Sequence, residues 1–395
     1  MLGLPLADPQ FWIVTLVAAA IVAWGVRRWR RSLRRGATPG CDRCAPAERA
    51  RRGKGLLLAV AALAAPARAG EPVERVVAAM GTELAVRIEG LERADALALS
   101  ERLVEAVERS EAALSTWRGT SELAALNRQP LGAPMPLSVA TWKALAEAVR
   151  CSHETDGAFD PTVGPLVAAW DLRGSGRVPE PAELEAARAR VGLAGLGLDR
   201  PGRSATRLAD VLIEEGGFGK GAALEAALAV ARETAPTAAV RLDFGGQLAW
   251  TGMSRPLELE IADPRDRARA VLTVDTGLLE GSASTSAGSE RDRVVDGVRI
   301  GHLLDPRSGR PAPGFGSATT IDPRPTLADC RSTGLWVLGP EAGRARVGAA
   351  PSQGDNLLVV VEGERLRALV PARLRGRVAA RVPDLEIEFV GRSSP

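Results

Sequence analysis

A carboxylate and a hydroxyl stand four residues apart in the stretch LADCRSTGLWVLG, residues 327–339. If this stretch is helical, Asp329 and Thr333 share one face, because residues i and i+4 are neighbours on a helix surface. Their oxygens are hard ligands of the kind that Mg²⁺ prefers. Pro325 and Thr326 indicate that the helix begins just before Asp329, so this carboxylate could instead serve only the helix dipole.

The stretch GGFGKGAALEAAL, residues 216–228, is a glycine-rich turn that leads into an expected helix. Backbone N–H groups at such a helix start, together with Lys220, could bind phosphate. The stretch is not a Walker A loop, because Gly221 follows Lys220 where that motif has Ser or Thr. It also fits a loose dinucleotide fingerprint after an expected strand at residues 211–215, which leaves open a redox protein that binds a dinucleotide without cleaving it.

Two Asp-Pro turns carry side chains that could line a pocket. In GAFDP, Phe159 and Asp160 offer an apolar ring and a carboxylate, with an ordinary turn as the alternative. In GHLLDPRSGRP, His302 and Asp305 could be a general base and the carboxylate that orients it, or only a local hydrogen-bonded pair. The glycine pair at 245–246 in LDFGGQLAW either lets a ligand approach a strand or marks a bulge.

Helices and strands alternate after about residue 71, with no linker long enough to separate two domains, so we expect one composite domain over residues 71–395. Apolar spacing predicts helices at 94–114, 136–153, 181–191 and 220–234. Alternating or continuous apolar runs predict strands at 80–88, 239–243, 257–261, 270–275 and 357–361. The expected fold class is α+β.

Composition excludes two classes of protein. Hydrophobic residues make up 46% of the 395 residues and charged residues 25%, which is typical of a packed globule rather than a disordered chain. The net charge is only +3, and much of the positive excess lies between Arg27 and Lys54, so nucleic-acid binding is not expected. Only three of the 51 Lys and Arg residues are Lys, which favours a specific role for Lys220 as a point charge.

The first seventy residues predict membrane attachment. Residues 11–26 form an apolar run followed by RRWRRSLRR, which indicates a membrane helix whose C-terminal end is cytoplasmic, in a segment 1–35. Segment 36–70 holds Cys41 and Cys44 and a second apolar run that resembles a signal peptide. Residues 71–395, either cleaved free or tethered, are then expected on the periplasmic or other extracytoplasmic side of the inner membrane. The alternative is a wrongly extended start, with only the second apolar segment real.

Taken in order, the motifs of the chain resemble the ApbE family of flavin transferases. The motifs are MGT (80–82), STWRGTSELAALN (115–127), GAFDPTVGPLVAAW (157–170), GGFGKG (216–221), LDFGG (242–246), STSAGSER (284–291), HLLDPRSG (302–309) and ADCRST (328–333). The resemblance implies an α+β fold of the T-fold type and an FAD held in a cleft. It implies Mg²⁺-dependent transfer of FMN from FAD to a Thr or Ser hydroxyl of a partner protein, with release of AMP. The partner it suggests is a subunit of a membrane electron-transfer complex; an FAD pyrophosphatase that yields FMN and AMP is the alternative.

The resemblance also assigns residues, position by position. Residues matching those that bind FAD are Met80, Trp117, Ala158, Phe159, Asp160, Glu214, Lys220 and Leu303. Residues matching the metal shell are Gly217 through its carbonyl, Asp329, Ser332 and Thr333. We expect His302 to handle a proton, Asp305 to orient it and Lys220 to stabilise charge on the phosphates. The chain departs from the family pattern where Glu214 replaces Asp, Trp117 replaces Tyr and Ser289 replaces an aromatic residue.

Overall fold

The computed structural model describes residues 71–288, 292–295, 297–350, 352 and 354–391. The predicted membrane helix, the Cys41 and Cys44 loop and the signal-like segment lie outside these residues. Within the described part, no helix combines the length and the apolar character that crossing a membrane requires.

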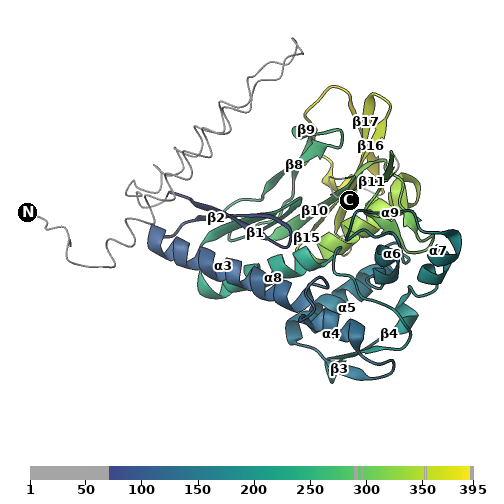
Figure 1. Cartoon of the computed structure of the whole chain (residues 1–395). Helices are drawn as coiled ribbons and strands as arrows, with labels where there is room; N and C mark the ends of the chain where they lie inside the picture. The colour runs from purple at the N-terminus through teal and green to yellow at the C-terminus, as the bar shows by residue number, and fades with distance from the viewer. Residues whose placement is uncertain (1–70, 289–291, 296, 351, 353, 392–395) are drawn as a thin grey trace, which may run out of the picture. The chain divides into compact units, whose positions relative to one another are not determined.

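A nine-stranded sheet forms the centre of the described part (Figure 1). Neighbouring strands are antiparallel except the last pair, which is parallel. Its strands, in spatial order, are β1 (Val73–Ala79), β2 (Thr82–Glu89), β6 (Ala239–Phe244), β7 (Gln247–Thr251), β10 (Gly281–Ala287), β15 (Gly316–Asp322), β16 (Asp355–Glu362), β17 (Arg365–Pro371) and β19 (Leu385–Val390).

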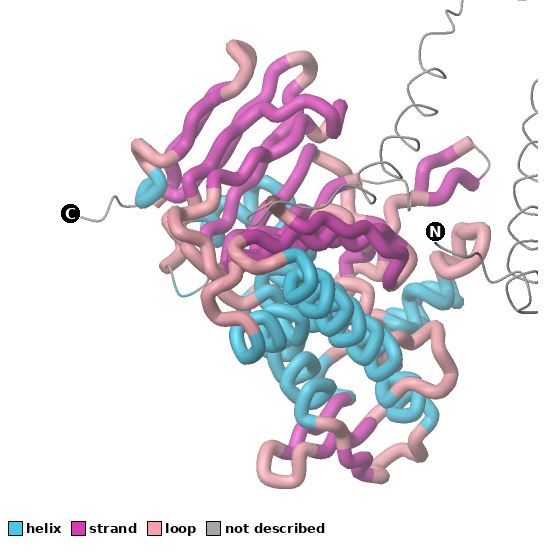
Figure 2. The backbone as a smooth tube through the Cα atoms, turned by 90° about the vertical axis from the view of Figure 1, so that its left-hand side faces the viewer, coloured by secondary structure: helices cyan, strands magenta, loops and turns pink. Residues whose placement is uncertain are grey.

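Three helices cover one face of this sheet, as Figures 1 and 2 show: α3 (Arg93–Leu114), α8 (Gly219–Thr234) and α9 (Pro325–Val347). Every second side chain of β2 is buried in a core shared with α3 and α8, which is the two-residue period of a strand. Along α3, Leu99, Leu103 and Val107 are buried at the four-residue spacing of a helix face. These two periods fix which sides of the sheet and helix meet.

The opposite face of the sheet is also covered, by a three-stranded sheet of β8 (Glu258–Asp263), β9 (Asp266–Asp275) and β18 (Val378–Ala380). Strand β16 shows this double burial directly. Leu357 and Val359 join the core shared with β8 and β9, whereas Leu358 and Val360 join the core shared with α9. The continuous apolar run at 357–361 is therefore that of a strand buried on both sides.

A second group of elements lies beside α8 and α9, at the lower right of Figure 1. Helix α5 (Val139–Glu154) packs on α9, and a disulfide joins Cys151 of α5 to Cys330 of α9. The other elements are α4 (Glu122–Arg128), α6 (Gly164–Ala169), α7 (Pro181–Arg188), the 3₁₀ turn η1 (Leu193–Gly195), β3 (Pro134–Pro136), β4 (Leu196–Asp199) and β5 (Ser204–Arg207). Two short hairpins, β11 (Arg293–Val295) with β12 (Val298–Ile300) and β13 (Leu304–Asp305) with β14 (Arg310–Pro311), and the turn η3 (Ala372–Leu374) complete the order.

The mixed α/β fold agrees with the sequence, and all four expected helices are present within a few residues of their predicted ends. Two local predictions are wrong, and one of two alternatives is excluded. Residues 211–215 form no strand and make only one bridge, from Val163 to Leu212. Met80 and Gly81 form the turn between β1 and β2 instead of starting a strand, because both have positive φ, 44° and 73°. The pair at 245–246 likewise turns the chain between β6 and β7, with φ of 59° and 94°, so it is a hairpin turn and not a bulge.

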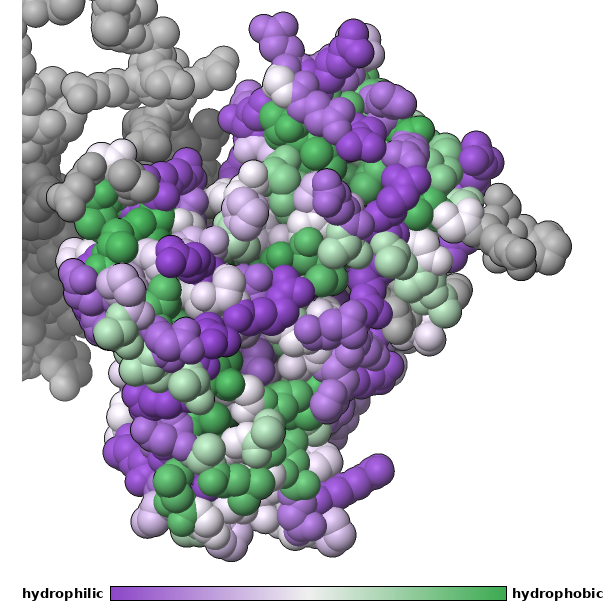
Figure 3. All heavy atoms as spheres, turned by 90° about the vertical axis from the view of Figure 1, so that its right-hand side faces the viewer, coloured by the Kyte–Doolittle hydropathy of each residue, from purple (hydrophilic) through white to green (hydrophobic). Residues whose placement is uncertain are grey.

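Apolar side chains reach the surface of the described part in separate patches among hydrophilic ones on the face shown in Figure 3. Single exposed apolar residues are normal in soluble domains and mark no site by themselves. The cavities described below are therefore a better guide to binding than surface hydropathy.

Candidate functional site

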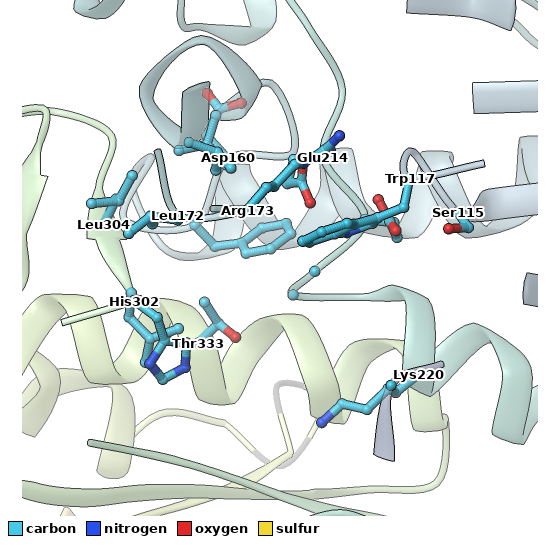
Figure 4. A pocket seen from close by; sticks show the side chains of 18 of the residues that line it. Ser115, Trp117, Asp160, Leu172, Arg173, Glu214, Lys220, His302, Leu304 and Thr333 are labelled. Atoms are coloured by element: carbon cyan, nitrogen blue, oxygen red, sulfur yellow. The ribbon is translucent and has the colours of Figure 1, made fainter. Parts of the chain in front are cut away.

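A cavity of about 610 Å³ lies where the β1–β2 turn, the start of α8, Thr333 of α9 and the loops around α6 meet. In Figure 4, Trp117, Arg173 and Glu214 lie along one side of the open space, and Lys220, Thr333 and His302 lie along the other. Predicted site residues that line this cavity are Met80, Trp117, Ala158, Phe159, Asp160, Glu214, Gly217, Lys220, His302, Leu303 and Thr333. The other three predicted site residues, Asp305, Asp329 and Ser332, are not in its lining.

Helix α8 begins against α9 because residue 221 has no side chain. A Cβ at Gly221 would stand 2.4 Å from the carbonyl oxygen of Pro325, so only glycine fits this contact. The N–H of Gly221 donates to Asp329 Oδ2 at 2.9 Å. The buried carboxylate of Asp329, with the residue 4% exposed, thus accepts a hydrogen bond from the first turn of α8. The alternative to a metal role in the sequence analysis was an interaction with the dipole of its own helix.

Glycine is also required where the loop before α8 meets α9. A Cβ at Gly217 would lie 2.9 Å from the ring of Phe159 and 3.4 Å from Thr333 Oγ1. Gly217 therefore lies close to the hydroxyl of Thr333, another residue of the expected metal shell. The Oγ1 atom of Thr333 itself lies 3.3 Å from the Asp329 carbonyl oxygen.

The three oxygens expected at the metal site are of the kind that a hard cation such as Mg²⁺ prefers. They are the Asp329 carboxylate, the Thr333 hydroxyl and the Gly217 carbonyl, with no sulfur or imidazole among them. Ser332 fits less well, because its hydroxyl is bonded to Ser284 Oγ at 3.2 Å and to the Asp329 carbonyl oxygen at 2.9 Å. Within the part of the chain that the structure describes, no group of three or more His, Cys, Asp or Glu side chains could hold a metal ion.

Arg173, which the sequence analysis did not select, forms much of the opposite wall. Its guanidinium carbon lies 5.0 Å from the ring centre of Trp117, a cation–π contact, and it pairs with the carboxylate of Glu214. It also donates to the Thr116 carbonyl oxygen at 3.1 Å. No local sequence signal marks Arg173, since it lies beyond the GAFD motif and reaches Trp117 only through the fold.

Two carboxyl groups in the cavity are buried enough to change their acidity. Burial, followed by repulsion from Glu215, raises the pKa of Glu214 to about 7, although Arg173 and Thr116 act in the opposite direction. Burial also raises the pKa of Asp160, against the effect of two hydrogen bonds from Thr162. The Thr162 N–H donates to Asp160 Oδ1 at 2.7 Å, and the Thr162 hydroxyl donates to the same oxygen at 2.6 Å. Asp160 therefore stabilises its own turn and also lines the cavity.

His302 is held by Asp292 and not by the expected Asp305. Its Nδ1 atom lies 2.6 Å from Asp292 Oδ1, which also accepts its backbone N–H at 3.0 Å. Arg299 donates to the other oxygen, Oδ2, at 2.8 Å. Asp292 is buried, which raises its pKa, but the hydrogen bonds from His302 and Arg299 hold the pKa below its usual value, so the carboxylate stays charged.

Asp305 has a different partner, Arg307. The Arg307 backbone N–H, Nε and Nη2 donate to its carboxylate at 2.9, 2.8 and 3.0 Å. The prediction that Asp305 orients His302 is therefore wrong. Asp292 follows the STSAGSER motif directly, but only its contact with His302 distinguishes it from other acidic residues.

Comparisons with known proteins point to one family. A family model described as "ApbE family" matches residues 80–355. The chain is 33% identical over 273 residues to an FAD:protein FMN transferase of Salmonella typhimurium, covering 66% of this chain and 77% of that protein. It is 31% identical over 308 residues to one of Klebsiella pneumoniae, covering 75% and 86%. The crystal structure of an ApbE protein from Thermotoga maritima superposes with a TM-score of 0.68 at 29% identity, covering 75% of this chain and 96% of that one.

Proposed function

Since this chain belongs to the ApbE family, we propose that it transfers FMN from FAD to a Thr or Ser hydroxyl of a partner protein and releases AMP. One observation carries the proposal to this chain. Lys220, the Gly217–Thr333 contact and His302 come from distant parts of the sequence and line one cavity. These are a cation for phosphate, oxygens for a hard metal and a group that can take a proton, which together suit phosphoryl transfer.

The proposed reaction exchanges one phosphorus–oxygen bond for another. The acceptor hydroxyl oxygen bonds to the phosphorus of the FMN half, and the bond from that phosphorus to the bridging oxygen breaks, so AMP leaves with the bridging oxygen. The hydroxyl proton passes to His302, whose ring Asp292 orients through Nδ1. Lys220, in the first turn of α8, stabilises the charge that develops on the phosphate oxygens.

Mg²⁺ is part of the proposal. Asp329, Thr333 and the Gly217 carbonyl would hold it, and when bound it would neutralise the pyrophosphate of FAD. The T-fold type of the domain is likewise proposed from the family resemblance.

Two features of the cavity support FAD as the substrate. Phe159 is buried in the wall and Trp117 is 61% exposed at the rim, so both could contact flat rings. Met80 extends from the β1–β2 turn toward the start of α8, where its Cε would be 3.3 Å from a Cβ at Gly219. The dinucleotide would then lie with its rings against the aromatic residues and its phosphates near Lys220.

The test is to mix the purified full-length protein with FAD, Mg²⁺ and a pool of short synthetic peptides, each with one central Thr or Ser. We expect AMP and a peptide carrying FMN to appear together in mass spectra, and neither to appear with EDTA. Free FMN and AMP with unmodified peptides would favour an FAD pyrophosphatase. Intact FAD in every reaction would favour a dinucleotide-binding protein that cleaves nothing.

The location of the domain is a further part of the proposal. We place residues 71–395 on the extracytoplasmic side of the inner membrane, attached through the N-terminal segments, with a membrane electron-transfer subunit as the acceptor. The disulfide between Cys151 and Cys330 supports this, because disulfides persist in oxidising compartments and are rare in the cytosol.

A further inference from the structure

We propose that a second cavity binds the segment of the partner protein that carries the acceptor hydroxyl. It lies on the other side of His302 from the cavity of about 610 Å³ in which FAD binding is proposed, here called the FAD cavity. This inference rests on the proposed function and names the place where its protein substrate docks. The second cavity has a volume of about 640 Å³. Residues of its lining that the argument uses are Gly288, Asp292, Arg299, Gly314, Phe315 and Trp336.

The two cavities share His302 and Leu303, so these residues form the boundary between them. His302 is fixed from the second cavity, because Asp292 lines that cavity and binds both Nδ1 and the backbone N–H of His302. In Figure 4, His302 lies at the end of the FAD cavity remote from Trp117. A hydroxyl presented from the second cavity would therefore reach the histidine without crossing the space needed for the flavin.

The direction of attack also favours entry from this side. In phosphoryl transfer the attacking and leaving oxygens lie roughly in line, on opposite sides of the phosphorus. If FAD fills the first cavity, its AMP half occupies space there, and the acceptor must approach from elsewhere. The second cavity gives that approach, with the proton acceptor at its inner end.

The charged side chains that line the two cavities suit different ligands. The first is lined by Lys220, Arg118, Arg173 and Arg293, and also by Glu111, Asp160, Glu214 and Glu215. Arg118 is paired with Glu111 and Arg173 with Glu214, so the pyrophosphate of a dinucleotide would meet chiefly Lys220 and Arg293. In the second, Arg299 is the sole Arg or Lys among the described lining residues, and it is paired with Asp292. These described residues offer little to neutralise the phosphates of a nucleotide, whereas the main chain of a polypeptide segment carries no such charge.

The walls of the second cavity allow the main chain of a bound peptide segment to lie in close contact with them. Phe315 and Trp336 stack with ring centres 4.7 Å apart and form an aromatic surface. Gly288 and Gly314 carry no side chain, so a guest backbone can approach the wall. A Cβ at Gly314 would meet no atom within 4 Å, and this residue has no positive φ, so larger side chains can be placed there without strain.

The experiment fills the cavity at Gly314. In full-length Gly314→Trp and Gly314→Leu we expect KM for a peptide labelled by the wild type to rise about tenfold or more, while KM for FAD stays unchanged. The smaller Leu keeps the test valid if the Trp variant does not fold. Val139→Trp is the matched control, because Val139 is 63% exposed and lines neither cavity. It should label the same peptide at the wild-type rate.

A photo-crosslinking amino acid provides a direct measurement. At position 314 it should capture the labelled peptide, and at position 139 it should not. If folded Gly314 variants label the peptide with wild-type KM, the second cavity is not the docking site, although the transferase proposal survives. If the wild type labels no peptide while cleaving FAD or leaving it intact, the transferase proposal fails, and the inference fails with it.

Discussion

At the residue scale, the Asp329 carboxylate has one observed role and one proposed role. It accepts the N–H of Gly221 in the first turn of α8, and it lies one helical turn before Thr333 at the proposed metal site. A helix start and a metal ion both favour an oxygen with negative charge, so one buried residue satisfies both. The two roles can be separated, because an amide keeps a hydrogen-bond acceptor but loses the charge.

We predict that Asp329→Asn abolishes Mg²⁺-dependent turnover and changes stability little, since its amide oxygen can still accept from Gly221. Asp329→Ala should also lose about 1–3 kcal/mol of unfolding free energy, because it leaves a buried N–H without an acceptor. Urea unfolding and AMP release measure the two effects. Full activity of Asp329→Asn in EDTA would show that the metal assignment is wrong.

Glu214 should make stability depend on pH. Its pKa is about 7 in the folded protein, whereas the ordinary pKa of a Glu side chain is 4.5. The folded state therefore favours the protonated form. This contribution is fully present below about pH 4.5 and is lost as the pH rises through 7, up to about 3 kcal/mol. Glu214→Gln should remove it, so the variant gains stability relative to the wild type between pH 4.5 and 8. If the free energies of urea unfolding of the wild type and of Glu214→Gln change in parallel with pH, this prediction is wrong.

Asp292 is a positioning residue, acting through His302. We predict that Asp292→Asn lowers kcat by about two to four orders of magnitude, by analogy with loss of the orienting carboxylate in a Ser-His-Asp triad, and leaves KM for FAD unchanged. Asp305→Asn is the control, because Asp305 is paired with Arg307 and lines neither cavity. Equal effects of both substitutions on kcat would argue against the assignment.

At the element scale, the site depends on how α8, α9 and α5 are held together. Gly221 lets α8 approach α9, and the disulfide from Cys151 to Cys330 joins α5 to α9 one residue after Asp329. The sequence separation of the two cysteines is 179 residues, so the bond closes a long loop of the unfolded chain.

We predict that Cys151→Ala lowers the free energy of unfolding by about 2–5 kcal/mol, the usual effect of losing a native disulfide. Dithiothreitol should lower the Tm of the wild type and leave the Tm of the variant unchanged. Cys330→Ala should behave like Cys151→Ala, because either substitution removes the same bond. If dithiothreitol does not change the wild-type Tm, even when it can reach the cysteines during unfolding, then the two cysteines are not paired in the purified protein.

At the scale of the whole molecule, the question is on which side of the membrane the domain lies. By the positive-inside rule, the charge pattern of the two apolar segments predicts that the Arg-rich loop is cytoplasmic. We predict that alkaline phosphatase fused after Gly70 is active in cells. A fusion after residue 40 should be inactive, and activity of both or of neither would contradict the proposed topology.

The sequence by itself determined much of the local structure and eleven of the residues that line the first cavity. Apolar spacing placed the four expected helices, and the helical i, i+4 spacing of Asp329 and Thr333 is that of α9. Eleven of the fourteen predicted site residues line the first cavity, in which FAD binding is proposed. The helix predictions hold because helix periodicity depends on neighbours a few residues away. The roles assigned to the site residues stay predictions, carried over from matching positions in the family.

Only the tertiary structure decided which of these residues act on one another. It gave His302 the partner Asp292 in place of Asp305, placed Arg173 over Trp117 and paired Cys151 with Cys330. Such contacts join segments that come together only when the sheet and helices pack, so sequence spacing carries no signal for them. The pKa of Glu214 depends on burial and on charges near it in space, and it too follows from packing rather than from sequence.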